Sequence, residues 1–478
     1  MENYLPHLTV GVLIEFLAVL LTFPWILTIK KDSSAAIAWC LIVLLVPLLG
    51  VTLFLIFGYT RVDRPVRRKR RHHARFVART PAHKKDLAEA ADDQLTGLPL
   101  RLGQIASRLG AFGPVGGNEV TLYHETQVAF DHLCDAIRDA RRHIHLQYFI
   151  IQPDEAGQKI IDLLAAKAKE GVQVRLLYDA VGSRRLTHRM LRSLIDCNGK
   201  CRSFLGFTSL RRLAVNMRNH RKIAVIDGRV GFTGGANIGR EYLGKDPHFG
   251  YWRDEQLRLE GPGVGGLQQI FVEDWDFATG EYLQGEDYFP ELPRVGDATV
   301  QIIAGGPDQD VNSIRELVFS AVTMARERLW IASPYIVPDQ GIMDALRFAA
   351  RLGVDVRLLC PLKPDHWLTY YAGRYYFTEL MAEGIKLYEY AKGMMHSKII
   401  LVDGQWASVG SANLDYRSLC LNFEANCLIH SPDLVAELEE AYRSDLQQSV
   451  RLELYAFRGR PFATRLLENG CRLLSPTL

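Results

Sequence analysis

His220-Arg-Lys-Ile-Ala-Val-Ile-Asp227 is repeated later in the chain as His396-Ser-Lys-Ile-Ile-Leu-Val-Asp403. Each copy leads into a short segment of small residues that ends in asparagine: Gly234-Gly235-Ala-Asn237 and Gly410-Ser411-Ala-Asn413. A pattern of this length does not recur in one register by chance. The chain is therefore predicted to contain a duplicated half-site, and the shared spacing disfavours two unrelated surface strands.

The repeated motif has the pattern of a β-strand that ends in a turn. Ile223–Ile226 and Ile399–Val402 are rich in β-branched residues, and an Asp-Gly pair follows each run, which is typical of a hairpin. Side chains at i and i+2 share one face of a strand, so each motif histidine is expected beside the lysine two positions on. Asp227 and Asp403 have the opposite parity, so we expect them to face the other way and to act as structural anchors.

Two facing half-sites would hold two imidazoles and two ammonium groups around one anion. This set suits exchange at a phosphodiester without a metal or other cofactor, because one imidazole can attack phosphorus and form a phosphohistidine. The other can protonate the leaving alkoxide and then deprotonate the incoming hydroxyl. We take His220 as the nucleophile and His396 as the acid and base, and the symmetry of the motif leaves the reverse order open.

The remaining motif residues are assigned to the phosphate. Lysines and asparagines would stabilise charge on the nonbridging oxygens, and small residues would let backbone or hydroxyl donors approach closely. The candidates are Lys222, Lys398, Asn237, Asn413, Gly235 and Ser411.

The repeat resembles the signature of the phospholipase D superfamily, and the chain as a whole resembles bacterial cardiolipin synthases. The second resemblance rests on six further segments: Thr233–Gly244, Tyr251–Asp254, Leu257–Pro262, Phe271–Trp275, Asn422–Glu424 and Arg472–Pro476. It implies two pseudo-symmetric α/β/α lobes with one shared active site, and the family counts both motif aspartates in its signature. It also implies that a downstream acid orients each histidine. Asp254 and Glu424 are the candidates, with a surface salt bridge as the alternative.

The resemblance implies a reaction in which a phosphatidyl group passes between two phosphatidylglycerol molecules, giving cardiolipin and glycerol. The rivals are a lipid-hydrolysing or headgroup-exchanging phospholipase D, a membrane-tethered nuclease and a non-enzymatic scaffold. Charge argues against the nuclease: residues 61–85 carry +10 and the whole chain +3, so the remainder carries −7. A nucleic-acid channel is expected to be basic, so phospholipids rather than nucleic acids are the predicted partners.

The duplication extends beyond the motifs. Gly171–Leu177 matches Gly353–Leu359, and Ile144–Ile150 parallels Leu329–Tyr335. Apolar strands that alternate with helical patterns predict an α/β fold with a largely parallel sheet covered on both faces. We predict four parts: a membrane hairpin over 1–60, a basic juxtamembrane linker with an amphipathic helix over 61–117, a first lobe over 118–295 and a second lobe over 296–478.

Residues 8–29 and 36–57 are each apolar and long enough to cross a bilayer, which predicts a transmembrane helical hairpin. Basic residues follow the second segment: Arg61, Arg64, Arg67, Arg68, Lys69, Arg70, Arg71 and Arg75. By the positive-inside rule they place the catalytic lobes on the cytoplasmic side of a bacterial inner membrane, although Lys30 and Lys31 argue weakly for the reverse. The cluster also suits attraction to anionic headgroups, and a nucleic-acid tail is a third interpretation.

Two kinds of segment can be interpreted either as part of the protein core or as a surface that contacts lipid. Leu98, Leu102, Ile105 and Leu109 recur at helical spacing, which predicts a helix that docks on a lobe or lies in the membrane interface. Apolar residues beside arginines precede each motif and suit either a core or a lipid channel: Phe204, Leu205 and Phe207 with Arg211 and Arg212, and Trp367–Phe377 around Arg374. The eight cysteines show no zinc spacing, so no metal site is expected.

Overall fold

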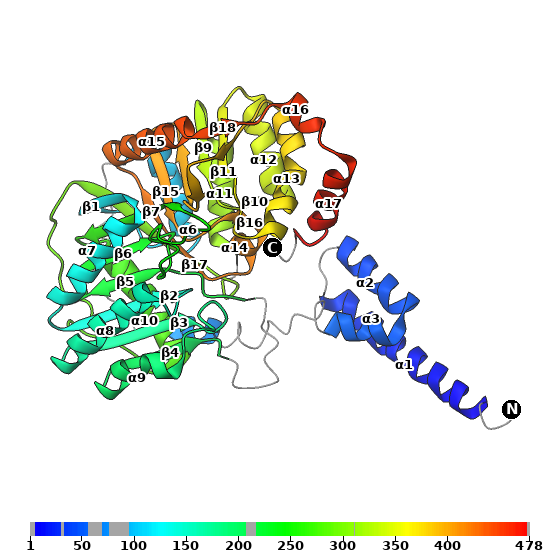
Figure 1. Ribbon diagram of the computed structural model, residues 1–478, viewed down its shortest axis with the longest axis horizontal. Coiled ribbons are helices and arrows are strands. Elements are labelled where there is room, and N and C mark those ends of the chain that lie inside the picture. The colour runs from blue at the N-terminus through cyan, green and yellow to red at the C-terminus, as the bar shows by residue number, and fades with distance from the viewer. Residues whose placement is uncertain are drawn as a thin grey trace. The chain divides into compact units, whose positions relative to one another are not determined.

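The computed structural model describes residues 5–29, 33–55, 69–75, 95–206, 217–309 and 311–475 (Figure 1). The chain separates into two compact units. The first comprises Met1–Arg68 with Phe207–Asn216, and the second comprises Lys69–Gly206 with Met217–Leu478. Several residues named above lie outside the described residues: Lys30, Lys31, Arg61, Arg64, Arg67, Arg68, Phe207, Arg211, Arg212 and Pro476.

Three helices form the described part of the first unit: α1 (Leu5–Ile29), α2 (Ser33–Leu45) and α3 (Pro47–Leu53). The prediction of one helix over 36–57 is wrong, because α2 ends at Leu45 and α3 begins at Pro47. Proline is tolerated in the first turn of a helix, where its missing amide hydrogen has no partner to lose. Among the described residues, no helix combines the length and the apolar character that crossing a bilayer requires.

One mixed sheet runs through the second unit in the order β18-β12-β11-β9-β14-β15-β17-β8-β1-β7-β6-β5-β2-β3-β4, with β13 beside β7. The first lobe contributes β1 (Val115–Glu125), β2 (His143–Tyr148), β3 (Gln173–Asp179), β4 (Lys200–Phe204), β5 (Ile223–Ile226), β6 (Val230–Gly234) and β7 (Tyr251–Glu260). The second contributes β8 (Ala298–Gly305), β9 (Arg328–Ala332), β11 (Asp355–Pro361), β12 (Lys386–Tyr390), β13 (Gly393–Met395), β14 (Ile399–Val402), β15 (Trp406–Gly410), β17 (Glu424–Ile429) and β18 (Ser449–Arg451). A separate parallel pair is formed by β10 (Ile336–Val337) and β16 (Leu414–Asp415).

The two lobes repeat one topology outward from the junction of β1 with β8. The order β1-β7-β6-β5-β2-β3-β4 in the first lobe corresponds to β8-β17-β15-β14-β9-β11-β12 in the second. This confirms the α/β fold and the pseudo-symmetry. The prediction of a largely parallel sheet is wrong, because parallel pairing is confined to β2-β3-β4 and β9-β11-β12 along this order. The turn after each motif strand reverses the chain, so β5 pairs antiparallel with β6 and β14 with β15. On their other edges, β5 and β14 also pair antiparallel, with β2 and β9.

Helices cover both faces of the sheet (Figure 1). Those of the first lobe are α7 (Thr126–Asp139), α8 (Glu155–Lys169), α9 (His188–Asp196) and α10 (Val264–Thr279). The second lobe carries α11 (Ser313–Met324), α12 (Gln340–Arg351), α13 (Trp367–Ala382), α14 (Tyr416–Cys420), α15 (Pro432–Gln447), α16 (Leu454–Arg458) and α17 (Phe462–Arg472). One core packs Leu146 of β2 against Leu164 of α8, and another brings together Leu267 of α10 and Tyr442 of α15. The second core includes residues of both lobes.

Two of the three segments with two interpretations are packed on the second lobe, and Phe204 of the third is buried at the end of β4 in the first lobe. Leu102 of α6 (Gly97–Arg108) is buried in the same core as Leu317 of α11, so the amphipathic helix docks on a lobe. The aromatic segment forms the first part of α13. Its Phe377 is buried in that core, whereas Trp367 at its start is exposed.

Candidate active site

The motif histidines lie where the two lobes meet. His220 precedes β5, and its amide donates to the carbonyl of Phe423 in the second lobe (2.8 Å). His396 follows β13, and its amide donates to the carbonyl of Arg253 in the first lobe (2.8 Å). The backbone of the opposite lobe therefore holds each motif segment. The regular strand is shorter than predicted and begins at Ile223, after the His-Lys pair.

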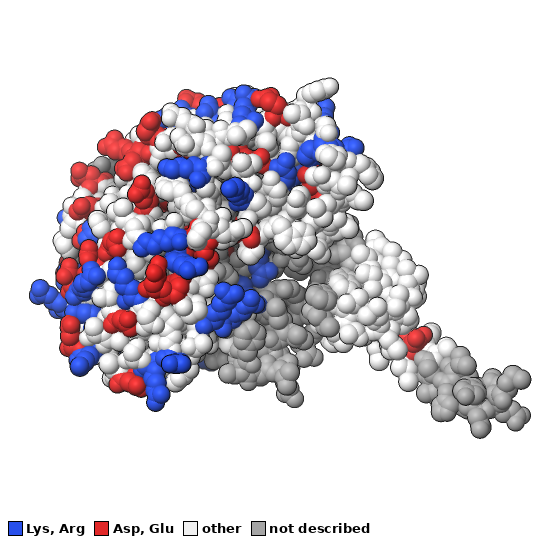
Figure 2. Space-filling model, viewed as in Figure 1, with Lys and Arg blue, Asp and Glu red and all other residues white. Residues whose placement is uncertain are grey.

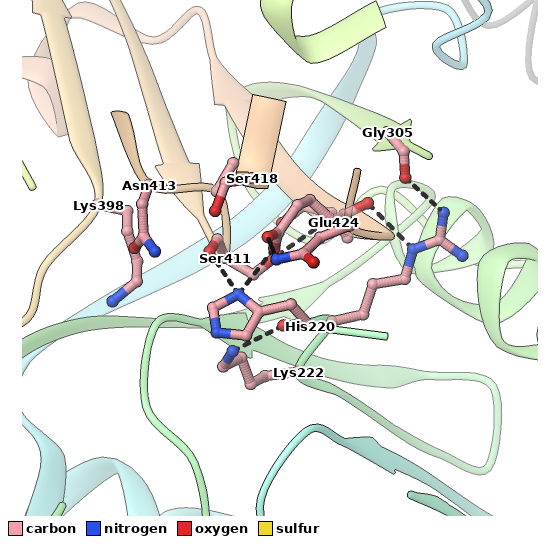
Figure 3. Close-up of polar contacts among 12 residues, drawn as sticks. His220, Lys222, Gly305, Lys398, Ser411, Asn413, Ser418 and Glu424 are labelled. Atoms are coloured by element: carbon pink, nitrogen blue, oxygen red, sulfur yellow. Dashed lines mark hydrogen bonds and ion pairs between the residues drawn. The ribbon is translucent and has the colours of Figure 1, made fainter. Parts of the chain in front are cut away.

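Each histidine is paired with a buried carboxylate of the other lobe. Nδ1 of His220 is 3.0 Å from Oε2 of Glu424, and Nδ1 of His396 is 2.6 Å from Oδ2 of Asp254. Both carboxylates are fully buried. A proton on Nδ1 that is donated to the carboxylate leaves Nε2 of each ring as the nucleophile or base. Figure 3 shows the first pair, in which the His220 ring faces Glu424 and Ser411.

Further donors hold the two carboxylates. The hydroxyl of Ser411 donates to Oε2 of Glu424 (2.5 Å), and the amide of Glu255 donates to Oδ1 of Asp254 (2.8 Å). Burial opposes ionisation of both acids. The pKa of Glu424 and the pKa of Asp254 nevertheless lie below their ordinary values, because the nearby charges of His220 and Lys398 respectively outweigh burial. Both groups are therefore carboxylates that can orient an imidazole.

The motif lysines are buried next to their histidines, as the spacing predicted. Nζ of Lys222 donates to the carbonyl of His220 (2.6 Å), and Nζ of Lys398 donates to the carbonyl of His396. Burial lowers the pKa of Lys222 to about 7 and the pKa of Lys398 to about 8. Lys398 and Asn413 line one small cavity and lie side by side in Figure 3. An anion bound beside either lysine would raise the pKa of that lysine, because it favours the charged ammonium group.

The surroundings disfavour protonation of both imidazoles in the free protein. Burial lowers the pKa of His220 below its ordinary value, while Glu424 opposes the shift. Burial and the charge of Lys398 together lower the pKa of His396 to about 4. Lys398 also acts on His220 across the lobes, so the two half-sites form one electrostatic unit.

Asp227 and Asp403 lie at the far ends of the motif strands. Asp227 accepts hydrogen bonds from the amides of residues 141–143 (2.8, 2.7 and 2.9 Å), which lead into β2. Asp403 accepts them from residues 326–328 (2.8, 2.8 and 2.9 Å), which lead into β9. Each aspartate has a φ of 54° and precedes a glycine of positive φ, as a tight hairpin turn requires. These contacts support the anchoring role that strand parity predicts.

Gly235 and Ser411 contact the carboxylates or their neighbours, and a contact of either residue with a phosphate stays a prediction. The amide of Gly235 donates to the carbonyl of Glu255 (3.1 Å), and a Cβ on Gly235 would lie 2.1 Å from Oδ1 of Asp254. The Ser411 hydroxyl donates to Glu424, and its amide donates to the carbonyl of Ala425 (3.0 Å). Small size at position 235 lets the carboxylate come close.

Asn237 and Asn413 are buried beside the motifs, and hydrogen bonds hold both side chains. Oδ1 of Asn237 accepts from the amide of Ile150 (3.2 Å), and Nδ2 of Asn413 donates to Oδ2 of Asp415 (3.1 Å). Their contact with a phosphate stays a prediction. In the described parts of the chain, no three His, Cys, Asp or Glu side chains gather as ligands for a metal ion.

Two aromatic side chains that the sequence reasoning did not single out flank the imidazoles. The ring of Phe149 is 4.8 Å from that of His220, and the ring of Trp252 is 5.1 Å from that of His396, measured between centroids. Trp252 shares its strand face with Asp254, so parity offered a signal for it. Phe149 lies in the loop after β2 and offered none. Both rings cover the site and contribute to the burial that lowers the histidine pKa values.

Comparison with known proteins decides the family. The model described as "Cardiolipin synthase, PLD-like domain" matches residues 133–248 and 318–446, and the model described as "Phospholipase_D-nuclease N-terminal" matches residues 16–58. The cardiolipin synthase of Alkalihalophilus pseudofirmus is 41% identical over 466 residues, which cover 94% of this chain and 90% of that protein. The chain belongs to the cardiolipin synthase family.

Other members of the cardiolipin synthase family agree. The enzyme of Geobacillus sp. strain WCH70 is 42% identical over 458 residues (94% of this chain, 90% of that one), and cardiolipin synthase 2 of Bacillus anthracis is 39% identical over 460 (94% and 88%). A phosphatidylserine synthase from Haemophilus influenzae Rd KW20 superposes with a TM-score of 0.58 at 17% identity, covering 80% of this chain and 100% of that one. That likeness shows the two-lobed α/β fold. The chain is thus a phosphatidyltransferase of the phospholipase D type.

Proposed function

We propose that this cardiolipin synthase transfers a phosphatidyl group from one phosphatidylglycerol to a hydroxyl of a second and releases glycerol. The observation that carries the proposal is the crosswise pairing of His220 with Glu424 and of His396 with Asp254. It supplies two buried imidazoles with separate partners, as a reaction with a covalent intermediate requires. The family supplies phospholipids as the substrate class, and the choice of phosphatidylglycerol is our proposal.

In the first half-reaction, Nε2 of His220 attacks the phosphorus of the donor lipid. A nitrogen–phosphorus bond forms, the bond from phosphorus to the glycerol oxygen breaks, and His396 gives that oxygen a proton. The phosphodiester anion raises the pKa of His396 from its low value in the free site, because a nearby negative charge favours the protonated ring. Glu424 offsets the positive charge that develops on His220.

In the second half-reaction, a glycerol hydroxyl of the second lipid replaces the departed glycerol. His396, now neutral, takes the hydroxyl proton while the oxygen attacks phosphorus and the bond to His220 breaks. Lys222 and Lys398 stabilise the charge on the nonbridging oxygens in both steps, and Asn237 and Asn413 add amide dipoles. One phosphodiester replaces another, so the balance of the reaction requires no nucleotide.

The reaction is tested with purified protein and phosphatidylglycerol as the sole lipid. We expect cardiolipin and glycerol in equal amounts. Phosphatidic acid without cardiolipin would show a hydrolase instead. Trapping with lipid labelled in its phosphatidyl group then assigns the nucleophile: His220→Ala should fail to label, whereas His396→Ala should label when the leaving group is a phenolate that needs no proton. The reverse pattern would make His396 the nucleophile.

We further propose that the first unit holds the enzyme in the bacterial inner membrane as a multi-pass anchor, with the lobes on the cytoplasmic side. Leu13, Phe16, Leu21 and Leu45 of its helices are exposed, and the described helices of this unit are almost entirely white in Figure 2. The basic run that follows supports the orientation. Alkaline carbonate should leave the protein in the membrane pellet, and protease should digest the lobes in inverted vesicles only. Release into the supernatant would contradict the anchor.

Nucleic acid is not proposed as a substrate. Over the described part of the face in Figure 2, basic and acidic side chains are interspersed on the second unit. Binding to a polyanion relies on clustered positive charge, so this distribution supports a lipid substrate. Cleavage of single-stranded DNA that is lost in His220→Ala would support the nuclease instead.

A further inference from the structure

Lys69 is buried in the second unit although it belongs to the basic run after the membrane helices. Only 1% of it is exposed. Its Nζ is 2.8 Å from Oδ1 of Asp274 and 2.9 Å from Oδ2 of Asp308, and it lies 4.4 Å from the centroid of the Phe423 ring. Burying an ammonium group is costly unless it is paired, and here two carboxylates pair with it. Burial opposes the charge, yet these carboxylates raise the pKa of Lys69 above its ordinary value.

The residues around Lys69 dock with it. Arg70 donates from Nε to the carbonyl of Asp308 (2.9 Å). Nδ1 of His72 is 3.0 Å from Oδ2 of Asp276, and Nδ1 of His73 is 3.1 Å from Oε2 of Glu273. These acidic partners lie on or beside α10. The short helical stretch over residues 69–75 is therefore seated on α10 of the first lobe and on the segment around Asp308 of the second lobe. Several polar contacts hold it there, rather than one chance ion pair.

The other oxygen of Asp274 holds both neighbours of His220. Oδ2 accepts from Nη1 of Arg221 (2.6 Å) and from Nδ2 of Asn219 (3.0 Å), and also from Nε2 of Gln147 (2.6 Å). Lys69 and the residues that flank His220 thus share one fully buried carboxylate. Any movement of Asp274 would be passed to the side chains of the residues on either side of the histidine.

Arg221 extends the link to the carboxylate partner of His220. Its Nε donates to the carbonyl of Glu424 (3.0 Å), and its Nη2 donates to the carbonyl of Gly305 (3.1 Å). Behind His220, the two positive charges of Lys69 and Arg221 therefore balance the two negative charges of Asp274 and Asp308. Without Lys69, both carboxylates would compete for Arg221. The guanidinium would then be drawn away from the Glu424 carbonyl, and the His220–Glu424 pair would lose its alignment.

We propose that Lys69 is a positioning residue of the active site, and that the segment following the membrane helices completes the catalytic centre by docking behind His220. This inference rests on the proposed function, in which His220 forms the covalent intermediate. It gives the basic run a role beyond orienting the protein in the membrane. Lys69 acts through Asp274 and Arg221 and does not touch the substrate. Its loss should therefore reduce kcat and leave the KM for phosphatidylglycerol nearly unchanged.

The test compares four full-length variants in one mixed-micelle assay, with rates referred to the folded fraction from thermal unfolding. Lys69→Met removes the buried charge, and Asp308→Asn removes one opposing charge. The double variant restores the balance, and Arg71→Met removes an exposed charge from the same segment as the matched control. We expect kcat to fall at least tenfold in Lys69→Met, to recover to within about threefold of wild type in the double variant, and to stay at the wild-type value in Arg71→Met.

Three results would overturn the proposal. The first is an unchanged kcat in Lys69→Met, and the second is an equal fall of kcat in Arg71→Met. The third is a double variant as slow as Lys69→Met, because charge balance would then not be the cause of the loss. If Lys69→Met does not fold, the double variant decides, because a folded but slow double variant contradicts the proposal and a folded, active one supports it. Cardiolipin formation by the wild-type protein in the same assay tests the proposed function separately, so the two failures can be told apart.

Discussion

His220 and His396 carry one motif but have different surroundings at the scale of single residues. His220 has Glu424 and the carbonyl of Ser411 at its Nδ1, whereas the Nδ1 of His396 lies 2.6 Å from Asp254 and also 2.8 Å from Nζ of Lys398. The adjacent ammonium group makes protonation of His396 strongly dependent on a neighbouring anion. A ring whose pKa rises when the substrate binds suits the acid and base, which leaves His220 as the proposed nucleophile.

Removing either carboxylate charge should slow different steps. We expect Glu424→Gln to lower kcat by about 10²–10⁴-fold, as for other oriented acid–base groups, because the developing charge on His220 loses its partner. Asp254→Asn should slow turnover similarly with phosphatidylglycerol. With a phenolate leaving group it should still form the labelled intermediate in a burst. Rapid-quench measurement of labelled enzyme checks this, and a burst in Glu424→Gln but not in Asp254→Asn would reverse the two histidine assignments.

The motif lysines should determine the alkaline limb of the pH profile, where activity falls as pH rises. An ammonium group attracts the phosphodiester only while protonated, and burial lowers the pKa of Lys222 to about 7 and that of Lys398 to about 8. The value of kcat/KM, which reports the free enzyme, should therefore fall as pH rises through this range. Lys398→Arg keeps its charge to much higher pH, so only Lys222 should still lose its charge in this range. The fall of kcat/KM should therefore be less steep in the variant, even if its maximum is lower. An alkaline limb that is identical in the two proteins would show that Lys398 does not control it.

At the scale of elements, the motif hairpins depend on their aspartates. Asp403→Ala removes three hydrogen bonds from part-buried amides to a carboxylate, which should cost about 3 kcal/mol in the free energy of unfolding. We expect the thermal midpoint to fall by several degrees, while kcat per folded molecule changes less than threefold. Asp403→Asn tolerates the positive φ and keeps one acceptor, so it should lose less. A large fall in kcat with an unchanged midpoint would assign Asp403 to catalysis.

At the scale of elements, the repeats could be predicted from the sequence, but the pairing between them could not. Spacing was sufficient to place His220 beside Lys222 and to predict the Asp-Gly turns, because both depend on residues a few positions apart. The crosswise partners Glu424 and Asp254 are set by β13 lying parallel to β7 and by the bridge from Asn219 to Phe423. Such contacts join distant parts of the chain and leave no local periodicity. The burial of Lys69 could not be predicted either, because its partners are distant in the chain. In addition, a basic run normally indicates solvent exposure.

At the scale of the whole molecule, the two lobes share one sheet, and the junction determines how the half-sites face each other. Strands β1 and β8 pair only at Val115 with Val300 and at Asn118 with Ala298. The fully buried Asn118 fills the irregularity between these pairs. Its Nδ2 donates to the carbonyls of Val115 (2.6 Å) and Ala298 (3.1 Å), and its Oδ1 accepts from the amide of Gly263 (2.7 Å). One side chain thus joins both lobes to the start of α10.

Asn118→Ala should therefore reduce activity as well as stability. The lost bonds leave buried backbone groups unpaired, at a cost of about 1–3 kcal/mol each. A small shift of one lobe would lengthen the distances from His220 to Glu424 and from His396 to Asp254 together, and misplacement of this kind should lower kcat by about tenfold or more. Gln301→Leu is the matched control, because Gln301 is buried and hydrogen-bonded to Phe112 and to α6 but does not contact the first lobe's motif. It should lower the thermal midpoint while kcat per folded molecule stays within about twofold. If Asn118→Ala lost stability alone, the junction would not control the alignment of the two half-sites.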